Sequence, residues 1–243
     1  MNKSQTIGEN FVPTIKKLSV ATITMQLLKK GLRNSSMQGV KPLNRPTKNI
    51  VGPAYTLRFI PAREDLSTPE IVGRDGYIPR IAIEEVPKDA VLVIDGRGAS
   101  NIAVLGDILI ERLQIRGVAG LVTDGGIRDL ETSLLSNFAI YAAGAAAPAS
   151  ISGHASGDLQ CPIGCGGIAV LPGDLIVGDS DGVAVIPNNL VKSVALDGLE
   201  QERFERFAKL KIKGGFQVIG TYPPSDEILS LYKDWIRAGE PDY

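Results

Sequence analysis

The chain has 243 residues, of which 44% are apolar and 22% are charged, and its formal net charge is −1. These values are typical of a soluble globular protein that is long enough to bury a substantial core. The balanced charge argues against nucleic acid as a partner, because a nucleic-acid-binding domain normally carries a basic footprint. The N-terminus has no apolar signal region and no stretch reaches about 18 apolar residues, so we expect a cytoplasmic protein with no membrane contact.

The N-terminal part of the chain is predicted to contain one helix, a loop and a strand. Apolar positions at helical spacing predict a helix that ends at Gly31, with Thr22 as its N-cap. Residues 33–49 are rich in Asn, Ser, Pro and Lys and should form a loop. Residues 51–60 are predicted to form a strand that Pro53 interrupts early.

The next segment is predicted to be a long loop followed by a helix and a buried strand. Residues 61–78 are polar and long enough to form a lid or an interface loop. Residues 78–86 suggest a short helix, with Pro79 suited to its first turn. Residues 90–94 are apolar throughout and indicate a buried strand.

Residues 106–129 are predicted to form a helix, a strand and the start of a second helix. The apolar positions of the first helix stop at Gly117, a residue that commonly ends helices. Residues 118–123 then form a short buried strand, residues 124–126 a turn, and residues 127–129 open the next helix. The apolar pattern of the first helix consists of Ile108, Leu109, Leu113 and Ile115.

The expected lengths of the helix and the strand are similar, so the two ends of this unit should lie close together. A helix of about ten residues spans roughly 15 Å, and a strand of about six residues spans roughly 20 Å. Asp107 should therefore lie near Arg128 and Asp129, beside two helix N-termini whose free N–H groups can bind a carboxylate or phosphate. A simpler interpretation stays open, in which Asp107 only complements the helix dipole and Arg128 with Asp129 forms a surface ion pair.

The C-terminal part is predicted to be rich in strands and then helical. Residues 139–142 indicate a strand, and residues 151–187 indicate several strands joined by turns. A long helix follows from Asn188, and a final helix runs from about Ser225, its possible cap, to Ala238. The buried stripe of the long helix is predicted to be Val191, Val194, Leu199, Phe204, Phe207 and Leu210. This order of elements indicates an α/β fold with mixed sheets and flanking helices.

Several polar residues outside the central cluster are predicted to be structural. Cys161 and Cys165 are expected to be small buried residues; a disulfide between them is the less favoured alternative, and a zinc site lacks its other ligands. His154 is expected to be a hydrogen-bonded structural histidine, and Asp124 either a turn residue or an anchor for metal-bound waters. Simple turn formers are expected at Asp95, Asp179 and Asp181.

Twenty residues separate Asp107 from the Arg128-Asp129 pair. This spacing resembles the D-x20-R-D signature of the RraA-like family. Similar family blocks occur in the expected order, so that the resemblance covers roughly residues 13–236. The chain departs from the family pattern at one position. Members of the family often carry an acid three residues after the aspartate that corresponds to Asp129, whereas this chain has Thr132 there and Glu131 one place earlier. The further blocks are residues 51–62, 90–98, 162–187 and 221–227.

The resemblance implies the architecture and the assembly. The fold would be a swivelling β/β/α domain, with residues 1–12 as a flexible tail and residues 13–243 as a single RraA-like domain that includes the C-terminal helices. The family also implies a homo-oligomer, a trimer or a hexamer, with its active site near a subunit interface. Glu202 or Glu205 could then enter a neighbouring site, although solvent exposure is the simpler expectation for each.

The chemistry that the resemblance implies is a carbon–carbon lyase of the metal-dependent, class II aldolase type. No lysine is placed for the Schiff base of a class I aldolase, whereas Mg2+ or Mn2+ suits oxygen ligands such as Asp129. The enzyme would cleave a 4-hydroxy-2-oxo acid, such as 4-hydroxy-4-methyl-2-oxoglutarate or a 2-keto-3-deoxy sugar acid, through a pyruvate enolate. Oxaloacetate decarboxylation would follow as a side activity.

The family resemblance also assigns roles at the central cluster. Arg128 would stabilise the enolate, and Asp107 would transfer a proton. The substrate carboxylate would be bound by Arg128 and by the backbone N–H groups of Gly106, Asp107, Ile108 and Leu109. An alternative function is a protein-binding regulator that inhibits a ribonuclease, because the family includes such proteins too.

Overall fold

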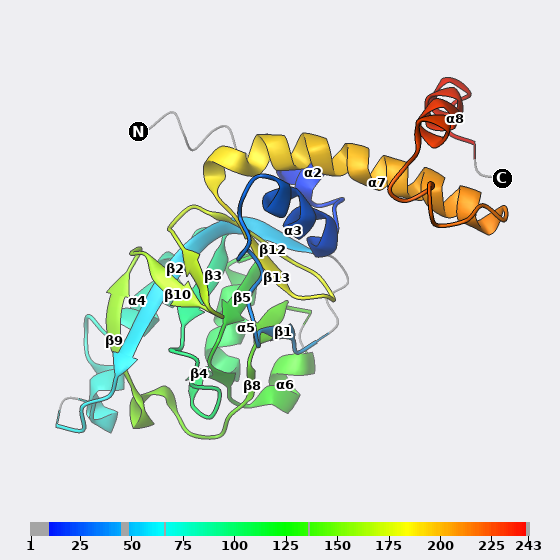
Figure 1. Ribbon diagram of the computed structural model, residues 1–243. Helices are drawn as coiled ribbons and strands as arrows, with labels where there is room; N and C mark the ends of the chain where they lie inside the picture. The colour runs from blue at the N-terminus through cyan, green and yellow to red at the C-terminus, as the bar shows by residue number, and fades with distance from the viewer. Residues whose placement is uncertain (1–9, 45–48, 66, 136, 242–243) are drawn as a thin grey trace.

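The protein is described by a computed structural model that covers residues 10–44, 49–65, 67–135 and 137–241. β-Sheets and helices form a compact body, and one long helix crosses this body and continues beyond it (Figure 1). The predicted α/β class with mixed sheets and flanking helices is thus confirmed. Most of the predicted tail, residues 1–9, lies outside the described residues, and the short helix α2 (Val12–Ile15) already begins at Val12.

The main sheet has eight strands in the order β1-β7-β5-β3-β2-β12-β13, with β9 paired to β2 beside this path. Neighbouring pairs among β2, β3, β5 and β7 are parallel, whereas β1, β9, β12 and β13 are joined by antiparallel pairing. The strands are β1 (Lys41–Pro42), β2 (Ile50–Pro61), β3 (Val91–Asp95), β5 (Gly120–Thr123), β7 (Ile140–Ala142), β9 (His154–Leu159), β12 (Leu175–Gly178) and β13 (Val183–Ile186).

Strand β2 is continuous over 12 residues, so the predicted interruption at Pro53 is wrong. Its first part pairs with β12 and its last part with β9, while β3 follows its other edge. Ala54 exchanges hydrogen bonds with Gly173 and Asp174 on the β12 side, so the nitrogen of Pro53 faces the β3 side. Pairing with β3 begins only at Ala54, and the N–H that proline lacks is therefore not needed there.

Two smaller sheets accompany the main one. Strands β4, β6 and β8 form a parallel three-stranded sheet, and β10 and β11 form an antiparallel hairpin. Their bounds are β4 (Ala103–Leu105), β6 (Gly126–Ile127), β8 (Gly144–Ala145), β10 (Ile163–Cys165) and β11 (Ile168–Val170). The segment 33–49 contains β1 besides the predicted loop, and residues 45–48 lie outside the described part of the chain.

The helices agree with most of the predicted ones and differ at some boundaries. The first long helix is capped by the side chain of Ser19, which accepts a hydrogen bond from the N–H of Thr22, so the predicted Thr22 cap is wrong. The predicted loop 61–78 contains a short 3-10 helix, η1 (Pro69–Gly73). The other helices are α3 (Val20–Lys29), α4 (Ile78–Glu85), α5 (Asp107–Ile115), α6 (Leu130–Leu135), α7 (Val191–Lys213) and α8 (Asp226–Arg237), with 3-10 helices η2 (Ser150–Ser152) and η3 (Asn188–Leu190).

The buried face of α5 differs from the predicted apolar pattern. Ile110 and Leu113 are buried, whereas Ile108 is 80% exposed and Ile115 is 68% exposed. The predicted start of the next helix at residues 127–129 is also wrong, because Ile127 belongs to strand β6 and α6 begins at Leu130. Two apolar residues of α5 therefore face outward in the single chain.

Helix α7 has a buried stripe only where another element covers it. Val191 and Val194 are buried in the body with α2, α3 and the β12–β13 hairpin, and Phe207 is buried against α8. Between these regions Leu199 is 40% exposed, so its predicted burial is wrong. Ser225 caps α8 as predicted by accepting a hydrogen bond from the N–H of Ile228.

Gly178 provides a test of how tightly the sheet packs on its neighbours. A Cβ atom there would lie 2.8 Å from Cζ of Tyr141 and 2.9 Å from Cγ1 of Ile50. We expect Gly178→Ala to lower the free energy of unfolding by about 1–3 kcal/mol, because an overpacked core must shift. Gly164→Ala is the matched control, since a Cβ there meets no atom within 4 Å. Urea unfolding measures both, and equal stability of the two variants would contradict this packing.

Candidate functional site

The candidate site lies where α5 begins, next to the end of strand β6. Strand β4 ends at Leu105, whose carbonyl oxygen accepts a hydrogen bond of 3.0 Å from the N–H of Arg128. A Cβ atom on Gly106 would lie only 2.7 Å from Oδ2 of Asp129 and 3.7 Å from Cβ of Arg128. The start of α5 and the Arg128-Asp129 pair are therefore adjacent, and the absence of a side chain on Gly106 makes room for the Asp129 carboxylate.

Asp129 has an unusual backbone conformation at this position. Its φ is +52°, in the left-handed region that aspartate tolerates better than most residues. Its carbonyl oxygen accepts hydrogen bonds of 3.0 Å from both the N–H and Oγ of Ser133, which holds it at the start of α6. The backbone bonds of α6 thus fix Asp129 while its carboxylate lies beside Gly106.

The first turn of α5 offers backbone donors without partners in the described residues. The N–H of Ile108 donates to Oδ1 of Asp107 over 2.8 Å, so this donor of the predicted set is already used. The N–H groups of Asp107 and Leu109 have no hydrogen bond to another described residue. Free donors at a helix N-terminus, with the positive end of the helix dipole, favour a bound carboxylate.

Arg128 is exposed and forms no ion pair with any described residue. The simpler interpretation of Arg128 and Asp129 as a surface ion pair is therefore wrong for the described part of the chain. The Cβ atom of Arg128 lies close to Gly106 at the start of α5, and its exposed side chain has no ion-pair partner among the described residues. A carboxylate and free N–H donors thus lie at the same helix start, and the backbone of an arginine adjoins them.

Asp124 joins three loops near this site. Its Oδ1 accepts a hydrogen bond of 2.7 Å from the N–H of Gly96, and its Oδ2 accepts one of 3.2 Å from the N–H of Gly166. It therefore ties the turn before β6 to the loop after β3 and to the β10–β11 hairpin. This structural role accounts for both of its oxygens, and an additional role towards metal-bound waters stays a prediction.

Two of the predicted turn formers also make longer-range contacts. Asp95 accepts hydrogen bonds from the N–H groups of Arg97 and Gly164, and burial followed by the nearby Asp124 raises the pKa of its carboxyl. Asp179 accepts a 2.8 Å hydrogen bond from the N–H of Val20 and so supports the start of α3. Asp95 and Asp179 therefore also connect segments that are distant in the sequence, which the prediction of simple turn formers did not include.

His154 is buried, with 2% of its surface exposed, and it stacks on Phe59 at a ring distance of 4.9 Å. Its Nδ1 accepts a hydrogen bond of 3.3 Å from Nε of Arg97, whereas its Nε2 has no partner among the described residues. Burial, reinforced by the positive Arg97, lowers the pKa of His154 to about 4. The predicted hydrogen-bonded structural histidine is thus right for Nδ1 and wrong for Nε2.

The remaining predicted residues have mixed outcomes. Cys165 is buried and Cys161 half-buried, and both are free thiols. Glu202 and Glu205 are half-buried: Glu202 accepts a hydrogen bond from the N–H of Ser19, and Glu205 accepts hydrogen bonds from Gln201 and Tyr222. Full solvent exposure was therefore wrong for both glutamates, and their entry into a neighbouring site stays a prediction.

The donor chemistry of the site suits a hard divalent cation rather than zinc or copper. No group of three or more His, Cys, Asp or Glu side chains that could hold a metal occurs in the described ranges. One or two carboxylates with water as the other ligands is a common arrangement for Mg2+, and the predicted ligand Asp129 has the oxygen donors that this arrangement needs. Within the part of the chain that the structure describes, no helix is long and apolar enough to cross a membrane.

Comparison with known proteins decides the family. The family model described as RraA-like, Aldolase/RraA, matches residues 20–185. The chain belongs to the RraA-like family. The predicted swivelling β/β/α fold of this family is confirmed, since its solved members share the architecture.

Three relatives illustrate what this RraA-like protein is similar to. A Halalkalibacterium halodurans protein, named as a candidate 4-hydroxy-4-methyl-2-oxoglutarate aldolase, is 33% identical over 75% of this chain and 80% of its own. The crystal structure of Streptomyces coelicolor RraAS2, described as an unusual member of the RNase ES inhibitor RraA family, matches with a TM-score of 0.74 at 31% identity, covering 83% of this chain and 96% of that one. An uncharacterized Pseudomonas syringae protein has a TM-score of 0.74 at 25% identity, covering 88% of this chain and 97% of that one.

The low pKa of His154 predicts a pH-dependent stability. In the unfolded chain a histidine binds a proton below about pH 6.5, whereas the folded chain binds it only below about pH 4. The free energy of unfolding should therefore fall as the pH drops from about 6.5 to 4, by on the order of 3 kcal/mol. His154→Phe should remove this part of the pH dependence.

The measurement is simple because the chain has a single histidine. NMR titration should show one imidazole with a pKa well below 6. Urea unfolding of the parent and of His154→Phe at several pH values then isolates its contribution. A pKa at or above 6.5 would contradict the buried, neutral ring.

Proposed function

We propose that this RraA-like protein is a divalent-metal-dependent pyruvate aldolase that cleaves a 4-hydroxy-2-oxo acid. The observation that carries the proposal is the position of the Asp129 carboxylate against Gly106, at the first turn of α5. This arrangement combines an oxygen ligand for a cation with free N–H donors for an anion. The likeness to a protein named as a candidate 4-hydroxy-4-methyl-2-oxoglutarate aldolase supports the same chemistry.

The substrate is held through its 2-oxo acid end. Its carboxylate binds the free N–H groups of Asp107 and Leu109 at the N-terminus of α5, where the helix dipole favours negative charge. The exposed guanidinium of Arg128 binds the same end of the molecule and stabilises the negative charge that develops on the 2-oxo oxygen. The contact of Arg128 with the 2-oxo oxygen strengthens as this charge grows, whereas the contacts with the carboxylate position the substrate.

Asp129 is the residue that would hold Mg2+ or Mn2+. The cation would supply Lewis-acid polarisation of the 2-oxo group and would leave most of its coordination sites to water and substrate. Asp129 suits this role because backbone bonds to Ser133 hold it and because Gly106 leaves its carboxylate uncovered on that side.

Asp107 transfers the protons in this proposal. It accepts the proton of the 4-hydroxyl, directly or through water, as the C3–C4 bond breaks and C4 becomes a carbonyl. The electron pair of that bond forms the enolate of pyruvate, and return of the proton to C3 gives pyruvate. The carboxylate of Asp107 first has to release the N–H of Ile108, to which it is bound here over 2.8 Å. Oxaloacetate decarboxylation passes through the same enolate and is expected as a side activity.

The surroundings of the site suggest that a second chain covers it. Ile108 is 80% exposed at the start of α5, and Leu135 is 84% exposed at the end of α6. Exposed apolar residues beside a polar site mark interaction surfaces. A homo-oligomer, a trimer or hexamer with the site near a subunit interface, is therefore part of the proposal.

The role of Asp129 is tested by one substitution and a neighbouring control. Asp129→Asn should lower the rate of pyruvate release by at least about 100-fold and should weaken Mn2+ binding measured by EPR, because a neutral amide is a poorer ligand. Glu131→Gln removes a nearby exposed charge and should leave both values unchanged. If Glu131→Gln lost activity and Asp129→Asn kept it, the proposal would have assigned the metal to the wrong acid.

The substrate class is tested on the unaltered protein. Pyruvate release is measured from 4-hydroxy-4-methyl-2-oxoglutarate, a 2-keto-3-deoxy sugar acid and oxaloacetate, with Mn2+, with Mg2+ and with EDTA. We expect release that requires the metal, and the preferred substrate then defines the class. Release that persists in EDTA would contradict the metal-dependent reaction.

A second function is supported by the likeness to RraAS2, a member of a ribonuclease-inhibitor family. In this role the protein would bind a ribonuclease and reduce its activity. The two functions are separated by a binding experiment with a purified RNase E-type enzyme. Tight binding in EDTA, combined with no pyruvate release from any of the three substrates, would favour the regulator over the lyase.

A further inference from the structure

Arg97 lies in the loop between β3 and β4, residues 96–102, and has an unusual backbone conformation. Its φ is +59°, in the left-handed region, and Gly98 follows with a φ of +65°. The N–H of Ala99 donates a hydrogen bond of 3.0 Å to the carbonyl oxygen of Gly96, which closes a turn around these two residues. Turns of this kind normally carry Asn, Asp or Gly at both central positions. An arginine in such a conformation indicates that its side chain has a specific role there.

The guanidinium group of Arg97 ties this loop to the start of β9. Its Nε donates a hydrogen bond of 3.3 Å to Nδ1 of His154, and its Nη2 donates one of 2.7 Å to the carbonyl oxygen of Gly153. His154 is itself fixed, because it is buried and stacks on Phe59 of β2. The carbonyl oxygen of Gly153 also accepts a hydrogen bond of 3.0 Å from the N–H of Ala62, directly after β2. Arg97 therefore holds the loop on two paired strands of the main sheet.

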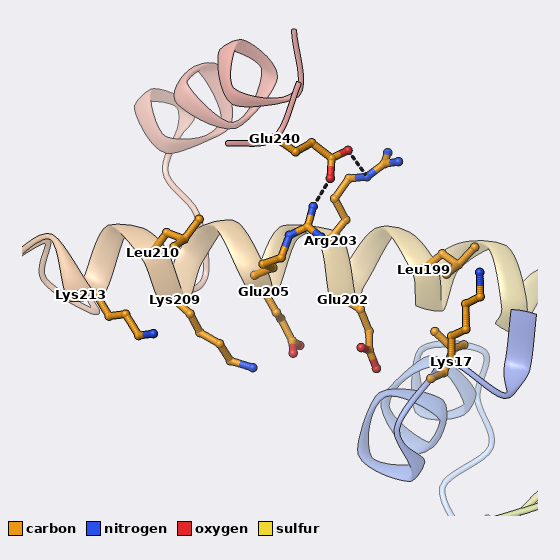
Figure 2. Close-up of a pocket in the computed structure, with 11 residues that line it drawn as sticks. Lys17, Leu199, Glu202, Arg203, Glu205, Lys209, Leu210, Lys213 and Glu240 are labelled. Atoms are coloured by element: carbon orange, nitrogen blue, oxygen red, sulfur yellow. Dashed lines mark hydrogen bonds and ion pairs between the residues drawn. The ribbon is translucent and has the colours of Figure 1, made fainter. Parts of the chain in front are cut away.

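The hydrogen-bond acceptors of Arg97 are neutral groups, a backbone carbonyl and an imidazole whose pKa is lowered to about 4. Arg203 of α7 shows a different arrangement, with its Nε 3.1 Å from a carboxylate oxygen of Glu240 (Figure 2). Arg97 forms no ion pair within the described ranges. Hydrogen bonds from the planar guanidinium are directional, so the contacts of Arg97 define a position rather than neutralise a charge.

The other side of the loop supports strand β6. A Cβ atom on Gly96 would lie 2.7 Å from Cα of Gly125, so the loop and the turn before β6 are in close contact. The N–H of Gly126 donates a hydrogen bond of 2.9 Å to the carbonyl oxygen of Ile102. Gly126 is the first residue of β6, and β6 leads directly to the segment that contains Asp129.

The same loop also determines where β4 begins. Ile102 is followed by Ala103, the first residue of β4, and β4 leads to Gly106 at the start of α5. The side chain of Ile102 packs closely beside the end of η2, since a Cβ atom on Gly153 would lie 2.1 Å from its Cδ1. A shift of the loop would therefore move β4 and β6 together with the two segments of the candidate site that follow them.

We propose that Arg97 is a positioning residue of the candidate active site, because it clamps the loop 96–102 against β9 and so sets the start of α5 relative to Asp129. This proposal rests on the proposed lyase function. In that function the N–H groups of α5 bind the substrate carboxylate while Asp129 holds the cation, so the separation between them must match the substrate. Arg97 acts through the backbone and does not touch the substrate.

Arg97→Gln should separate metal binding from substrate binding. The affinity for Mn2+ alone should be unchanged, since Asp129 is held by Ser133 and not by the loop. Pyruvate binding in the presence of Mn2+ should weaken, and kcat for pyruvate release should fall, each by at least about tenfold, because a displacement of about 1 Å at α5 is sufficient for such a loss. EPR of Mn2+ and calorimetric titration with pyruvate measure the two affinities.

Two other substitutions of Arg97 separate position from stability. Arg97→Gly relieves the left-handed backbone but removes both side-chain contacts, so it should be more stable in urea than Arg97→Gln and equally slow. Arg97→Lys keeps the charge and a donor, and should recover part of the activity. Activity that follows stability through this series, with Arg97→Gly faster than Arg97→Gln, would contradict a positioning role.

A double variant tests whether Arg97 acts through His154. His154→Phe keeps a ring beside Phe59 but removes the acceptor Nδ1. The combined variant should be no slower than Arg97→Gln alone, because both substitutions break the same connection. Losses that simply multiply would contradict this route. Arg33→Gln is the control, since it removes an exposed arginine from the segment that reaches β13, and it should leave all values unchanged.

Hydrogen exchange tests the clamp without any catalysis. In Arg97→Gln the amides of residues 103–107 and 126–130 should exchange at least about tenfold faster than in the parent protein, whereas those of α7 should not change. If this pattern appeared and the parent protein released no pyruvate from any substrate, the proposed function would fail while the clamp would be supported. If the parent protein was active and Arg97→Gln matched it in pyruvate binding, kcat and exchange, the positioning role would be overturned.

Discussion

The pairing of β4 with β6 is the contact on which the candidate site depends. One hydrogen bond of this pair, from the N–H of Arg128 to the carbonyl of Leu105, brings together two segments that are separated by a helix and a strand. Because Gly106 has no side chain, Oδ2 of Asp129 can lie only 2.7 Å from the position that a Cβ atom would occupy. A larger residue at this point would force the carboxylate away from the start of α5. The site therefore rests on backbone geometry more than on contacts between side chains.

The same geometry explains why opposite charges gather here. The first turn of α5 presents positive backbone groups, Arg128 adds a full positive charge, and Asp129 adds a carboxylate that can hold a cation. Each feature is exposed enough for a small substrate to reach it. Asp124 fixes the adjacent loops through the N–H groups of Gly96 and Gly166, so the turn between β5 and β6 cannot move independently. This arrangement suits the negatively charged 2-oxo acid that we propose as the substrate.

The sequence predicts the parts of this structure that local patterns encode. Apolar periodicity and capping residues were sufficient for α4 and α8, and the family spacing pointed to the Asp107, Arg128 and Asp129 region. The short strands β4 and β6 were missed, because segments of two or three residues have no detectable period. Contacts between distant residues were missed as well. Asp179 supports α3 from 159 positions away, and no local pattern reveals this.

The outward-facing residues Ile108 of α5 and Leu199 of α7 were mispredicted for a related reason. Ile108 and Leu199 belong to apolar patterns that normally indicate burial, yet both are exposed in the single chain. A periodic pattern records which face of a helix is apolar, but not whether the same chain or another copy covers it. Exposed members of such patterns are therefore informative about assembly. They lie at the candidate active site, where we propose a contact between copies, and on α7.

The most direct test of the site is to locate metal and substrate in one crystal. Crystals grown with Mn2+ and pyruvate would be measured by anomalous diffraction. The account predicts a manganese peak beside the Asp129 carboxylate, with the pyruvate carboxylate at the N-terminal N–H groups of α5 and Arg128 in contact with the same molecule. A manganese peak elsewhere in the protein, or pyruvate bound away from α5, would contradict the central claim that these residues form one catalytic site.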